Sequence, residues 1–498
     1  MATSAQSETA TRAGAGELVK GLGLLDATTI VMGSMIGSGI FIVAAEIGRE
    51  VGSPGLMLLT WVLSGLMTVI AAVTYGELAA MMPHAGGQYV YLRESLSPLF
   101  GFLYGWTMFL VIQTGTIAAV AVAFGKFLGV FFPWISAQNL LLDLGTVTVP
   151  LWGQTVRLGI SSQQFVALTS LMTLAVVNIF GLRTGAWLQN IFTTMKVAAL
   201  AAVIAVGGWW SLAHPAPASG AGFWGGANWS LATFVMISAA LVGPLFSSDA
   251  WNNVTFTGAE VVNPKRNLPL ALFTGTAVVS TLYFLTNCVY LRILPFAGSA
   301  AGAGPLERGI THAAEDRVAT AAMQVVFGSA GSALMAAAIV ISTFGCNNGL
   351  TLAGARVYYA MAKDRLFFPS VAKVSPKYHT PAVSLMVQGI WASLLTLSGT
   401  YNQLLNYVIF SVLLFYILTI VGLFRLRRTR PEWPRPYRAW GYPVLPAIYV
   451  AIAVFVEVAL LTEQMTRGQS LAGLGIVIVG VPVYYFWRPR GASPVARS

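Results

Sequence analysis

Long apolar segments recur along almost the whole chain and restrict it to one kind of fold. A helix needs about 20 apolar residues to cross a bilayer, and segment after segment reaches that length. Only 9% of the residues are charged, whereas a soluble domain carries about 25%. A chain so poor in charge has too little polar surface to face water, so we expect an integral membrane protein.

These segments predict an all-α membrane protein with about twelve transmembrane helices. Helices are favoured over a barrel because each segment is long and apolar, whereas the strands of a membrane barrel are short and alternating. A polar tail at 1–25 and a short basic tail at 488–498 flank the spans. The expected spans are 26–48, 55–80, 98–130, 162–180, 186–209, 229–258, 268–294, 330–360, 381–398, 402–424, 441–462 and 470–487.

The basic residues indicate how these spans are oriented. If both termini are cytoplasmic, 20 of the 28 Lys and Arg residues fall in cytoplasmic segments and 7 in external ones. Basic residues collect on the cytoplasmic side of membrane proteins. The net charge of +11 is therefore a topology signal, and we expect no nucleic-acid partner.

The first span contains a segment that suits an unbroken helix poorly. Its sequence GSMIGSGIF at 33–41 places three glycines and two serines within seven residues. Each glycine costs a helix about 1 kcal/mol relative to alanine. Small residues at this spacing also let membrane helices pack closely, so close packing is an alternative explanation of this motif taken alone.

The sixth span contains a second segment of this kind and favours a helix break in both. Its sequence GPLFSSDAWNN at 243–253 includes Pro244, which removes a backbone donor, and Asp249, which is costly inside a bilayer. The two segments lie about 210 residues apart, at the start of two five-span blocks at 26–209 and 229–424. Paired interrupted helices at matching positions indicate the substrate site of a transporter built from inverted repeats.

The chemistry of such breaks suits a zwitterion. Backbone N–H groups freed at Gly37, Ser38 and Gly39, at the start of a half-helix, favour a carboxylate. Carbonyl groups freed at the ends of the other half-helices favour an ammonium group. A glycine-rich backbone also lets the ligand approach without an intervening side chain.

Several further motifs share their order and spacing with a known family. Together with the motif of the first span, they make the chain resemble the amino acid–polyamine–organocation superfamily, and most of all its L-type amino acid transporters, as a bacterial amino acid permease. The further motifs are GSPGL at 52–56, TYGEL at 74–78, HAGGQYVYL at 84–92, GAEVVNPKRNLPLAL at 258–272, STFGCNNG at 342–349 and RRTRPEWPRPYRAW at 427–440.

The resemblance implies a leucine-transporter-like fold, in which two inverted five-helix repeats are followed by two helices at 441–487. It implies that the backbone amides of 37–39 bind the substrate carboxylate. The carbonyl groups of Met35, Phe246 and Asp249 would bind the amine, and the ring of Phe246 would cover the substrate. The implied function is secondary active transport of amino acids by alternating access, as an antiporter or a proton symporter.

Lys196 lies about ten residues into the fifth span, roughly 15 Å along the helix from either interface. The resemblance implies that a lysine here replaces a sodium ion and bridges the first span to the eighth. Gly33 or Ser34, together with Ser342, are the expected partners, and the lysine could exchange a proton during transport. A lysine that only ties helix-end carbonyl groups together for stability is the alternative.

Asp249 departs from the L-type pattern, which has a small residue, usually glycine, at this position. An acid beside the amine site could favour cationic substrates or bind a co-transported proton. Aspartate also caps helix N-termini well, so a purely structural role is the alternative. A polyamine or cationic amino acid permease of the same superfamily is the second functional hypothesis.

Other functional classes fit the sequence less well. A membrane enzyme would need clustered catalytic groups, and H-E-x-x-H, G-x-S-x-G and phosphate-loop motifs are absent from the sequence. A channel would need a continuous pore lining, whereas the sequence offers two isolated breaks. We therefore expect no catalytic residues and no enzymatic activity.

The sequence also bears on cofactors and partners. The four histidines show no metal-binding spacing, so we expect neither a metal nor a cofactor. Animal L-type transporters use a cysteine between spans 3 and 4 to link to an accessory glycoprotein, but 131–161 contains no cysteine. We therefore expect no disulfide-linked subunit, and the resemblance implies a multi-pass protein of the bacterial inner membrane, surrounded by membrane lipid.

Overall fold

A computed structural model describes residues 20–149, 154–180, 182–215, 217, 222–225, 228–398 and 401–488. Among these residues, ten helices are long and apolar enough to cross a membrane. Two shorter apolar helices, Leu231–Ser247 and Ala382–Leu397, accompany them. The prediction of a helical, multi-pass membrane protein is confirmed, whereas the twelve-span count and the inverted repeat stay predictions.

The helices of the first half follow the predicted spans closely, with the first span divided in two. They are α2 (Leu24–Met35), α3 (Gly39–Val51), α4 (Pro54–Met81), α5 (Gln88–Ser95), α6 (Pro98–Thr107), a π-helical turn (Met108–Ile112), α7 (Gln113–Leu128), α8 (Ser162–Ile179) and α9 (Leu182–Ala213).

The second half begins with a span that is also divided. The helices of the second half are α10 (Leu231–Ala240), α11 (Val242–Ser247), α12 (Asn253–Phe256), α13 (Pro264–Ile293), α14 (Pro305–Arg308), α15 (Val318–Lys363), α16 (Ala382–Ser398), α17 (Tyr401–Thr429), α18 (Val444–Thr462) and α19 (Gln464–Trp487). Short 3-10 turns occupy Gly258–Glu260, Ala314–Asp316 and Pro369–Ala372. The longest helix, α15, bends at Gly328, whose φ of 64° interrupts the helical backbone before the predicted eighth span begins.

A β-hairpin between α7 and α8 corrects the purely helical prediction. Strands β1 (Leu140–Val149) and β2 (Gln154–Ser161) pair antiparallel, with Leu140 opposite Ser161 and Val149 opposite Gln154. Alternating Thr and Val residues near the end of β1 suit a strand. Such a short alternating run is easily overlooked beside the long apolar spans.

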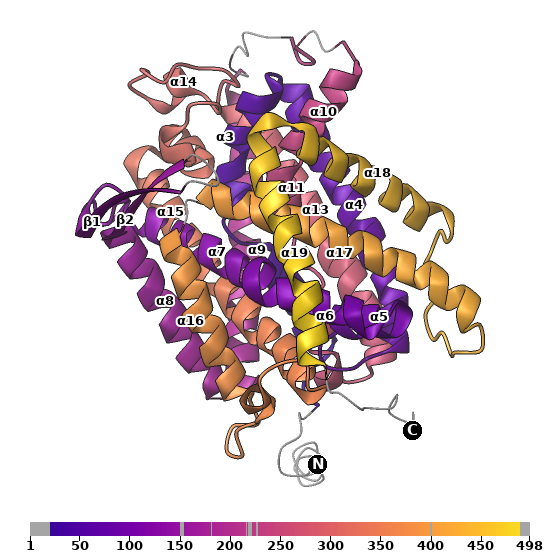
Figure 1. Ribbon diagram of the computed structural model, residues 1–498. Coiled ribbons are helices and arrows are strands. Elements are labelled where there is room, and N and C mark those ends of the chain that lie inside the picture. Colours follow the sequence, from indigo (N-terminus) through magenta and orange to yellow (C-terminus); the bar gives the residue numbers. More distant parts are fainter. Residues whose placement is uncertain are drawn as a thin grey trace, which may run out of the picture.

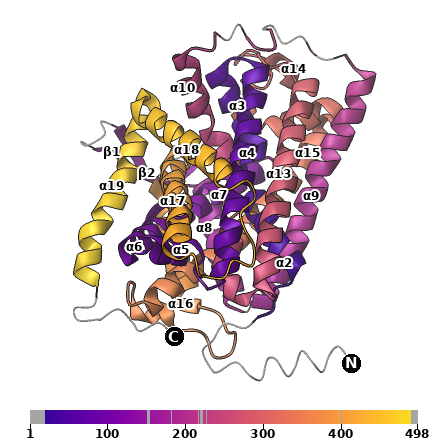
Figure 2. The ribbon, with the colours of Figure 1, turned by 90° about the vertical axis from the view of Figure 1, so that its right-hand side faces the viewer.

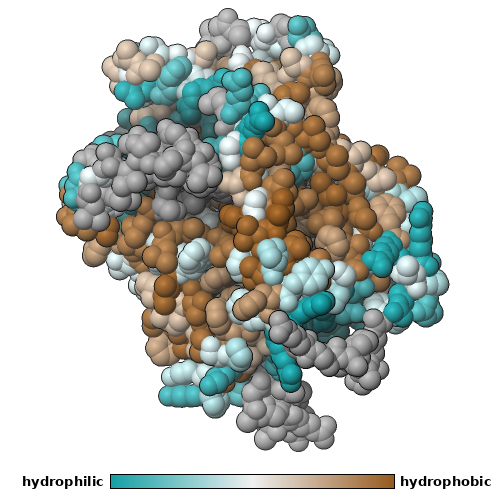
Figure 3. Space-filling model, viewed as in Figure 1, coloured by the Kyte–Doolittle hydropathy of each residue, from teal (hydrophilic) through white to brown (hydrophobic). Residues whose placement is uncertain are grey.

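The two ends of the helix bundle differ in what they carry. In Figures 1 and 2, α2 begins at the lower end, where α5 and the loop after α17 also lie. The upper end carries the end of α3, the short helix α14 and the start of α10. Figure 3 shows hydrophobic residues gathered across the middle of this face, around α19, with hydrophilic residues above and below them. This arrangement suits a bundle surrounded by lipid.

The broken helices lie inside the bundle rather than at its edge. Helix α2 packs against α9 and α13, and α3 packs against α11. Every residue of 36–45 is buried. The outer helices, such as α9, α13 and α19, expose large apolar side chains instead. The interrupted backbone of the first span is thus kept away from lipid, as a membrane protein requires.

Candidate functional site

The two predicted helix breaks face each other at the centre of the bundle. Helix α2 ends at Met35 and α3 begins at Gly39, while α11 ends at Ser247 and α12 begins only at Asn253. A Cβ atom on Gly39 would lie 3.0 Å from the Cα atom and 2.1 Å from the Oγ atom of Ser247. Only glycine therefore allows the start of α3 to approach α11 this closely.

Side chains from two other helices satisfy carbonyl groups that the end of α2 leaves without helical partners. From α9, the ammonium group of Lys196 donates to the carbonyl oxygens of Gly33, at 2.6 Å, and Ile36, at 2.9 Å. From α15, the hydroxyl of Ser342 donates to the carbonyl oxygens of Ile36, at 3.3 Å, and Gly37, at 3.4 Å. Lys196 and Ser342 thus meet at one shared carbonyl group, that of Ile36.

Ser34 contacts α15 through its backbone carbonyl group rather than through its side chain. Its carbonyl oxygen accepts a hydrogen bond of 3.1 Å from the thiol of Cys346 on α15. Its hydroxyl is buried and has no hydrogen-bond partner among the described residues. Of the two partners expected for Lys196 in the first span, Gly33 is therefore the one that it contacts.

Tyr283 on α13 joins the two breaks, and the sequence reasoning did not identify it. Its hydroxyl lies 2.9 Å from the carbonyl oxygen of Met35 and 3.1 Å from that of Ser247. The only sequence signal was a polar hydroxyl in the middle of an apolar span. A carbonyl oxygen has two lone pairs, so Met35 retains the capacity to accept a second donor.

Asp249 lies in the break between α11 and α12 and is 7% exposed. Its carboxylate accepts a hydrogen bond of 2.7 Å from the hydroxyl of Tyr416 on α17. The capping position of α12 is Asn252, and no side-chain cap hydrogen bond is present there. The next residue, Ala250, has a φ of 63°, a backbone conformation that is uncommon outside glycine.

Three small cavities surround this break, and Asp249 lines all of them. Each has a volume of about 10 Å³, which is room for about one water molecule. The cavity between the breaks is lined by all six residues predicted to bind substrate, which are Met35, Gly37, Ser38, Gly39, Phe246 and Asp249. The structure therefore brings together two segments that lie about 210 residues apart in the sequence.

A much larger cavity of about 740 Å³ lies toward the upper end. It is lined by α3, α7 and the base of the β-hairpin, through residues that include Ile42, Val122 and Gln138. Lys126, Asp316 and other charged residues line it as well. The same two helices, α3 and α7, also line the small cavity between the breaks. Ile42 lies less than one helical turn beyond Gly39.

A buried ion pair joins segments at the lower end, below the breaks. Glu260, just after α12, pairs with Arg356 on α15 at 3.3 Å, and both side chains are 1% exposed. The backbone N–H of Leu22, before α2, donates to the carbonyl oxygen of Glu260 at 3.0 Å. The segment that precedes the first span is thus fastened to the end of the sixth.

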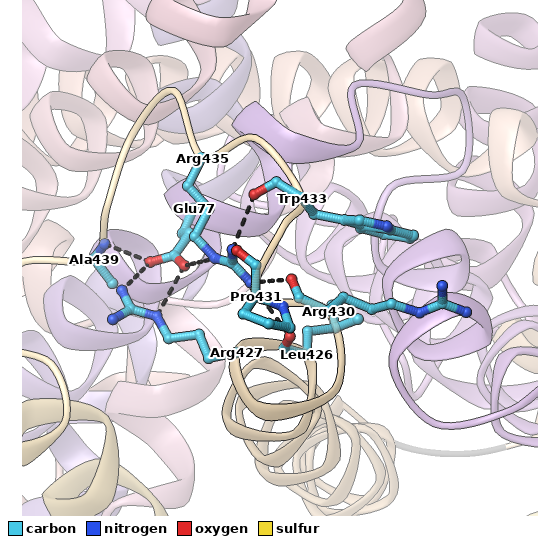
Figure 4. Close-up of polar contacts among 8 residues, drawn as sticks. All are labelled: Glu77, Leu426, Arg427, Arg430, Pro431, Trp433, Arg435 and Ala439. Carbon is cyan, nitrogen blue, oxygen red and sulfur yellow. Dashed lines mark hydrogen bonds and ion pairs between the residues drawn. The ribbon is translucent and has the colours of Figure 1, made fainter.

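A second cluster at the lower end centres on Glu77, which is fully buried near the end of α4 (Figure 4). Arg427 at the end of α17 contacts both carboxylate oxygens of Glu77. Arg435 approaches the same carboxylate at 3.4 Å, and the backbone N–H of Ala439 donates to it at 2.7 Å. Figure 4 shows Arg435 enclosed by backbone carbonyl groups of its own loop. Glu77 therefore holds the loop between α17 and α18 against α4.

Comparison with known proteins bears on the function of this site. A family profile described as amino acid permease matches residues 22–481. The chain is 29% identical to the serine/threonine exchanger SteT of Bacillus subtilis (strain 168), over 96% of this chain and 98% of the relative. It is 28% identical to the human b(0,+)-type amino acid transporter 1, over 96% of this chain and 91% of the relative.

A third relative is the human large neutral amino acids transporter small subunit 2, which is 28% identical over 97% of this chain and 85% of the relative. These matches confirm the resemblance that the motifs indicated. The family profile covers nearly all of the membrane region, which shows that the chain belongs to the amino acid permease family.

Proposed function

We propose that this amino acid permease exchanges amino acids across the membrane by alternating access and binds them between the two helix breaks. The observation that carries the proposal is the shared cavity, because all six residues expected from sequence line it. Relatives named as exchangers or amino acid transporters support the substrate class.

Recognition of the substrate carboxylate falls to the start of α3. Gly37, Ser38 and Gly39 precede or open that helix, whose N-terminal N–H groups and dipole favour an anion. The carbonyl groups of Met35, Phe246 and Asp249 would hold the ammonium group on the opposite side of the cavity. A ligand larger than water needs more room than the present cavity offers, so binding requires the two breaks to separate.

Lys196 would set the geometry of the first break during this movement. It holds the carbonyl groups of Gly33 and Ile36 while Ser342 holds Ile36 from α15. The ammonium group of Lys196 is thus a single positive charge held by carbonyl oxygens, and a sodium ion bound at this position would be held in the same way. Proton exchange by this lysine is the form of coupling that we propose, in an antiporter or a symporter.

The two ends of the molecule support a cycle that starts from the upper side. The upper cavity is large and reaches α3 and α7, whereas Glu260 and Arg356 close the lower end. We place the upper end outside and both termini in the cytoplasm of a bacterium. We propose twelve spans, with inverted repeats at 26–209 and 229–424, because an even number of spans leaves both termini on the same side.

We propose that this transporter acts without enzymatic chemistry and without a disulfide-linked subunit. One relative is named as a small subunit. This chain has two cysteines, Cys288 and Cys346, and both lie in apolar helices rather than between α7 and α8.

A second candidate function is transport of cationic amino acids or polyamines. The observation that favours it is the buried carboxylate of Asp249, which lines all three central cavities and receives a hydrogen bond from Tyr416. A carboxylate at that position can pair with a cationic side chain.

Purified protein in liposomes separates these candidates. Vesicles loaded with one unlabelled compound are screened for uptake of labelled amino acids, arginine and putrescine, with and without a pH gradient. We expect uptake of amino acids that depends on an amino acid inside the vesicle. Uptake into empty vesicles driven by the pH gradient would indicate symport, and ion conductance without countertransport would contradict the proposal.

A further inference from the structure

A groove of about 580 Å³ runs along the outside of the bundle at its lower end. Its walls are α4, the first third of α13 and the loop between α17 and α18. Helices α4 and α13 pack side by side along their length, as Figure 2 shows. The groove lies apart from the substrate site, and the transport cycle proposed above makes no use of it.

The groove is polar at its start and apolar along the rest of its length. Lys265 and Arg266, in the first turn of α13, line its outer part. Leu270 and Phe273 line it deeper along the same helix and are 38% and 48% exposed. Eight residues separate Lys265 from Phe273, which is about 12 Å along a helix. A headgroup and the upper part of an acyl chain span a similar length.

The two cations at the start of the groove are available to a ligand. Both side chains are exposed, and neither forms an ion pair or side-chain hydrogen bond within the described part of the chain. Two buried acids of the lower end have other partners, because Glu260 pairs with Arg356 and Glu77 with Arg427.

Aromatic side chains of the loop form the third wall. Trp440 is 76% exposed and lines the groove together with Tyr437. Exposed tryptophan and tyrosine side chains are typical of the boundary between lipid and water. A basic, aromatic-rimmed pocket between membrane helices on the cytoplasmic side is suited to an acidic lipid headgroup.

We propose that this groove binds an anionic phospholipid, with its phosphate between Lys265 and Arg266 and an acyl chain along Leu270 and Phe273. The charge of the groove matches the headgroup, and its apolar floor matches the chain. A soluble anion would use the two cations but would leave the apolar wall uncovered.

The bound lipid would also hold the loop that Glu77 fastens. A Cβ atom on Gly76 would lie 3.0 Å from the ring of Tyr437, so the loop touches α4 beside the groove. Ala439 of the same loop donates to Glu77. A lipid between Tyr437 and α13 therefore adds a contact to the segment that closes the lower end.

Native mass spectrometry of the purified protein, titrated with phosphatidylglycerol or phosphatidylcholine in detergent, tests the proposal. We expect wild-type protein to retain phosphatidylglycerol selectively. Lys265→Gln together with Arg266→Gln should weaken its retention roughly 30-fold, because each basic side chain near an anionic lipid contributes about 1 kcal/mol. The matched control is Lys373→Gln with Lys377→Gln, which removes the same charge from another exposed lower segment and should retain the lipid as wild type does.

Equal retention by both double variants would overturn the proposal. Displacement of the lipid by inorganic phosphate at equal molarity would overturn it too, because the groove would then be a site for a soluble anion. The measurement needs no transport, so its failure is separate from a failure of the proposed exchange. Because the substituted residues are exposed, both double variants should fold, and their thermal unfolding checks that they do.

Discussion

At the scale of single residues, Lys196 explains how a broken helix is kept in a membrane interior. The end of α2 leaves buried carbonyl groups without helical partners, and a buried ammonium group would also be costly without acceptors. Lys196 is 1% exposed and joins the two, with Gly33 and Ile36 as acceptors. The ammonium group supplies the donors that the carbonyl groups need, and the carbonyl groups supply the acceptors that the ammonium group needs.

Replacing this lysine should therefore stop transport. In Lys196→Ala, the carbonyl group of Gly33 loses its side-chain donor, at about 1–3 kcal/mol, and that of Ile36 keeps only the weaker donor Ser342, so the first break should lose its geometry. We expect uptake into liposomes to fall more than tenfold while the protein still inserts and purifies. Thr194→Ala, on the exposed side of the same helix, is the control and should transport normally. Wild-type uptake by Lys196→Ala would contradict the role assigned to Lys196.

Asp249 should determine which side chains the site accepts. Asp249→Gly removes the only acid among the described residues that line the three central cavities, and it frees the hydroxyl of Tyr416. A hydrogen bond to a charged group is worth about 1.5–3 kcal/mol, so the ratio of cationic to neutral uptake should fall roughly tenfold or more. Uptake of labelled arginine and serine, each across a range of pH, measures this. Unchanged selectivity and unchanged pH dependence together would leave Asp249 without a functional role.

At the scale of elements, the sequence located the two breaks and named Lys196 and Ser342 beside the first, but it did not identify the tyrosines that contact them. Glycine and proline inside apolar spans weaken a helix locally, so the breaks at 36–38 and 248–252 could be located from composition. Tyr283 contacts Met35 across 248 residues of sequence, and Tyr416 contacts Asp249 across 167. Such pairs depend on how the helices pack, which spacing along the chain does not reveal.

The Glu77 cluster should stabilise the closed lower end. Glu77→Gln removes the charge that Arg427 and Arg435 share, and breaking a buried ion pair costs about 3–5 kcal/mol. Arg427 is partly exposed, so we expect the lower part of this effect, seen as a fall of several degrees in the melting temperature of the purified protein. Glu432→Gln, an exposed acid of the same loop, should leave the melting temperature unchanged. Equal melting temperatures for both variants would show that the cluster carries little stability.

At the scale of the whole molecule, the distribution of basic residues and the two unequal ends support one orientation. The loop rich in arginine, at 427–440, lies at the lower end, and the 740 Å³ cavity lies toward the upper one. The orientation stays a prediction, which the sequence can make because the position of basic residues governs it. The sequence could not supply the cavity, because the β-hairpin and the separate helices α3, α7 and α8 all contribute to its wall.

Labelling from outside the cell tests this orientation. In a background of Cys288→Ser and Cys346→Ser, Gln138→Cys places a thiol in the upper cavity and Lys373→Cys places one at the lower end. A membrane-impermeant maleimide should label the first variant in intact cells and the second only after the membrane is opened. The reverse pattern would invert the proposed topology.

The close contact between Gly39 and Ser247 offers a test of substrate binding between the two breaks. In Gly39→Ala, the added Cβ atom would lie 2.1 Å from the Oγ atom of Ser247, in the space between the breaks where the substrate would bind, whereas the Cβ atom added in Gly208→Ala meets nothing within 4 Å. The measurement is equilibrium binding of the labelled amino acid that wild type exchanges fastest. We predict wild-type affinity for Gly208→Ala and a loss of tenfold or more for Gly39→Ala. Equal affinity in the two variants would place the substrate elsewhere.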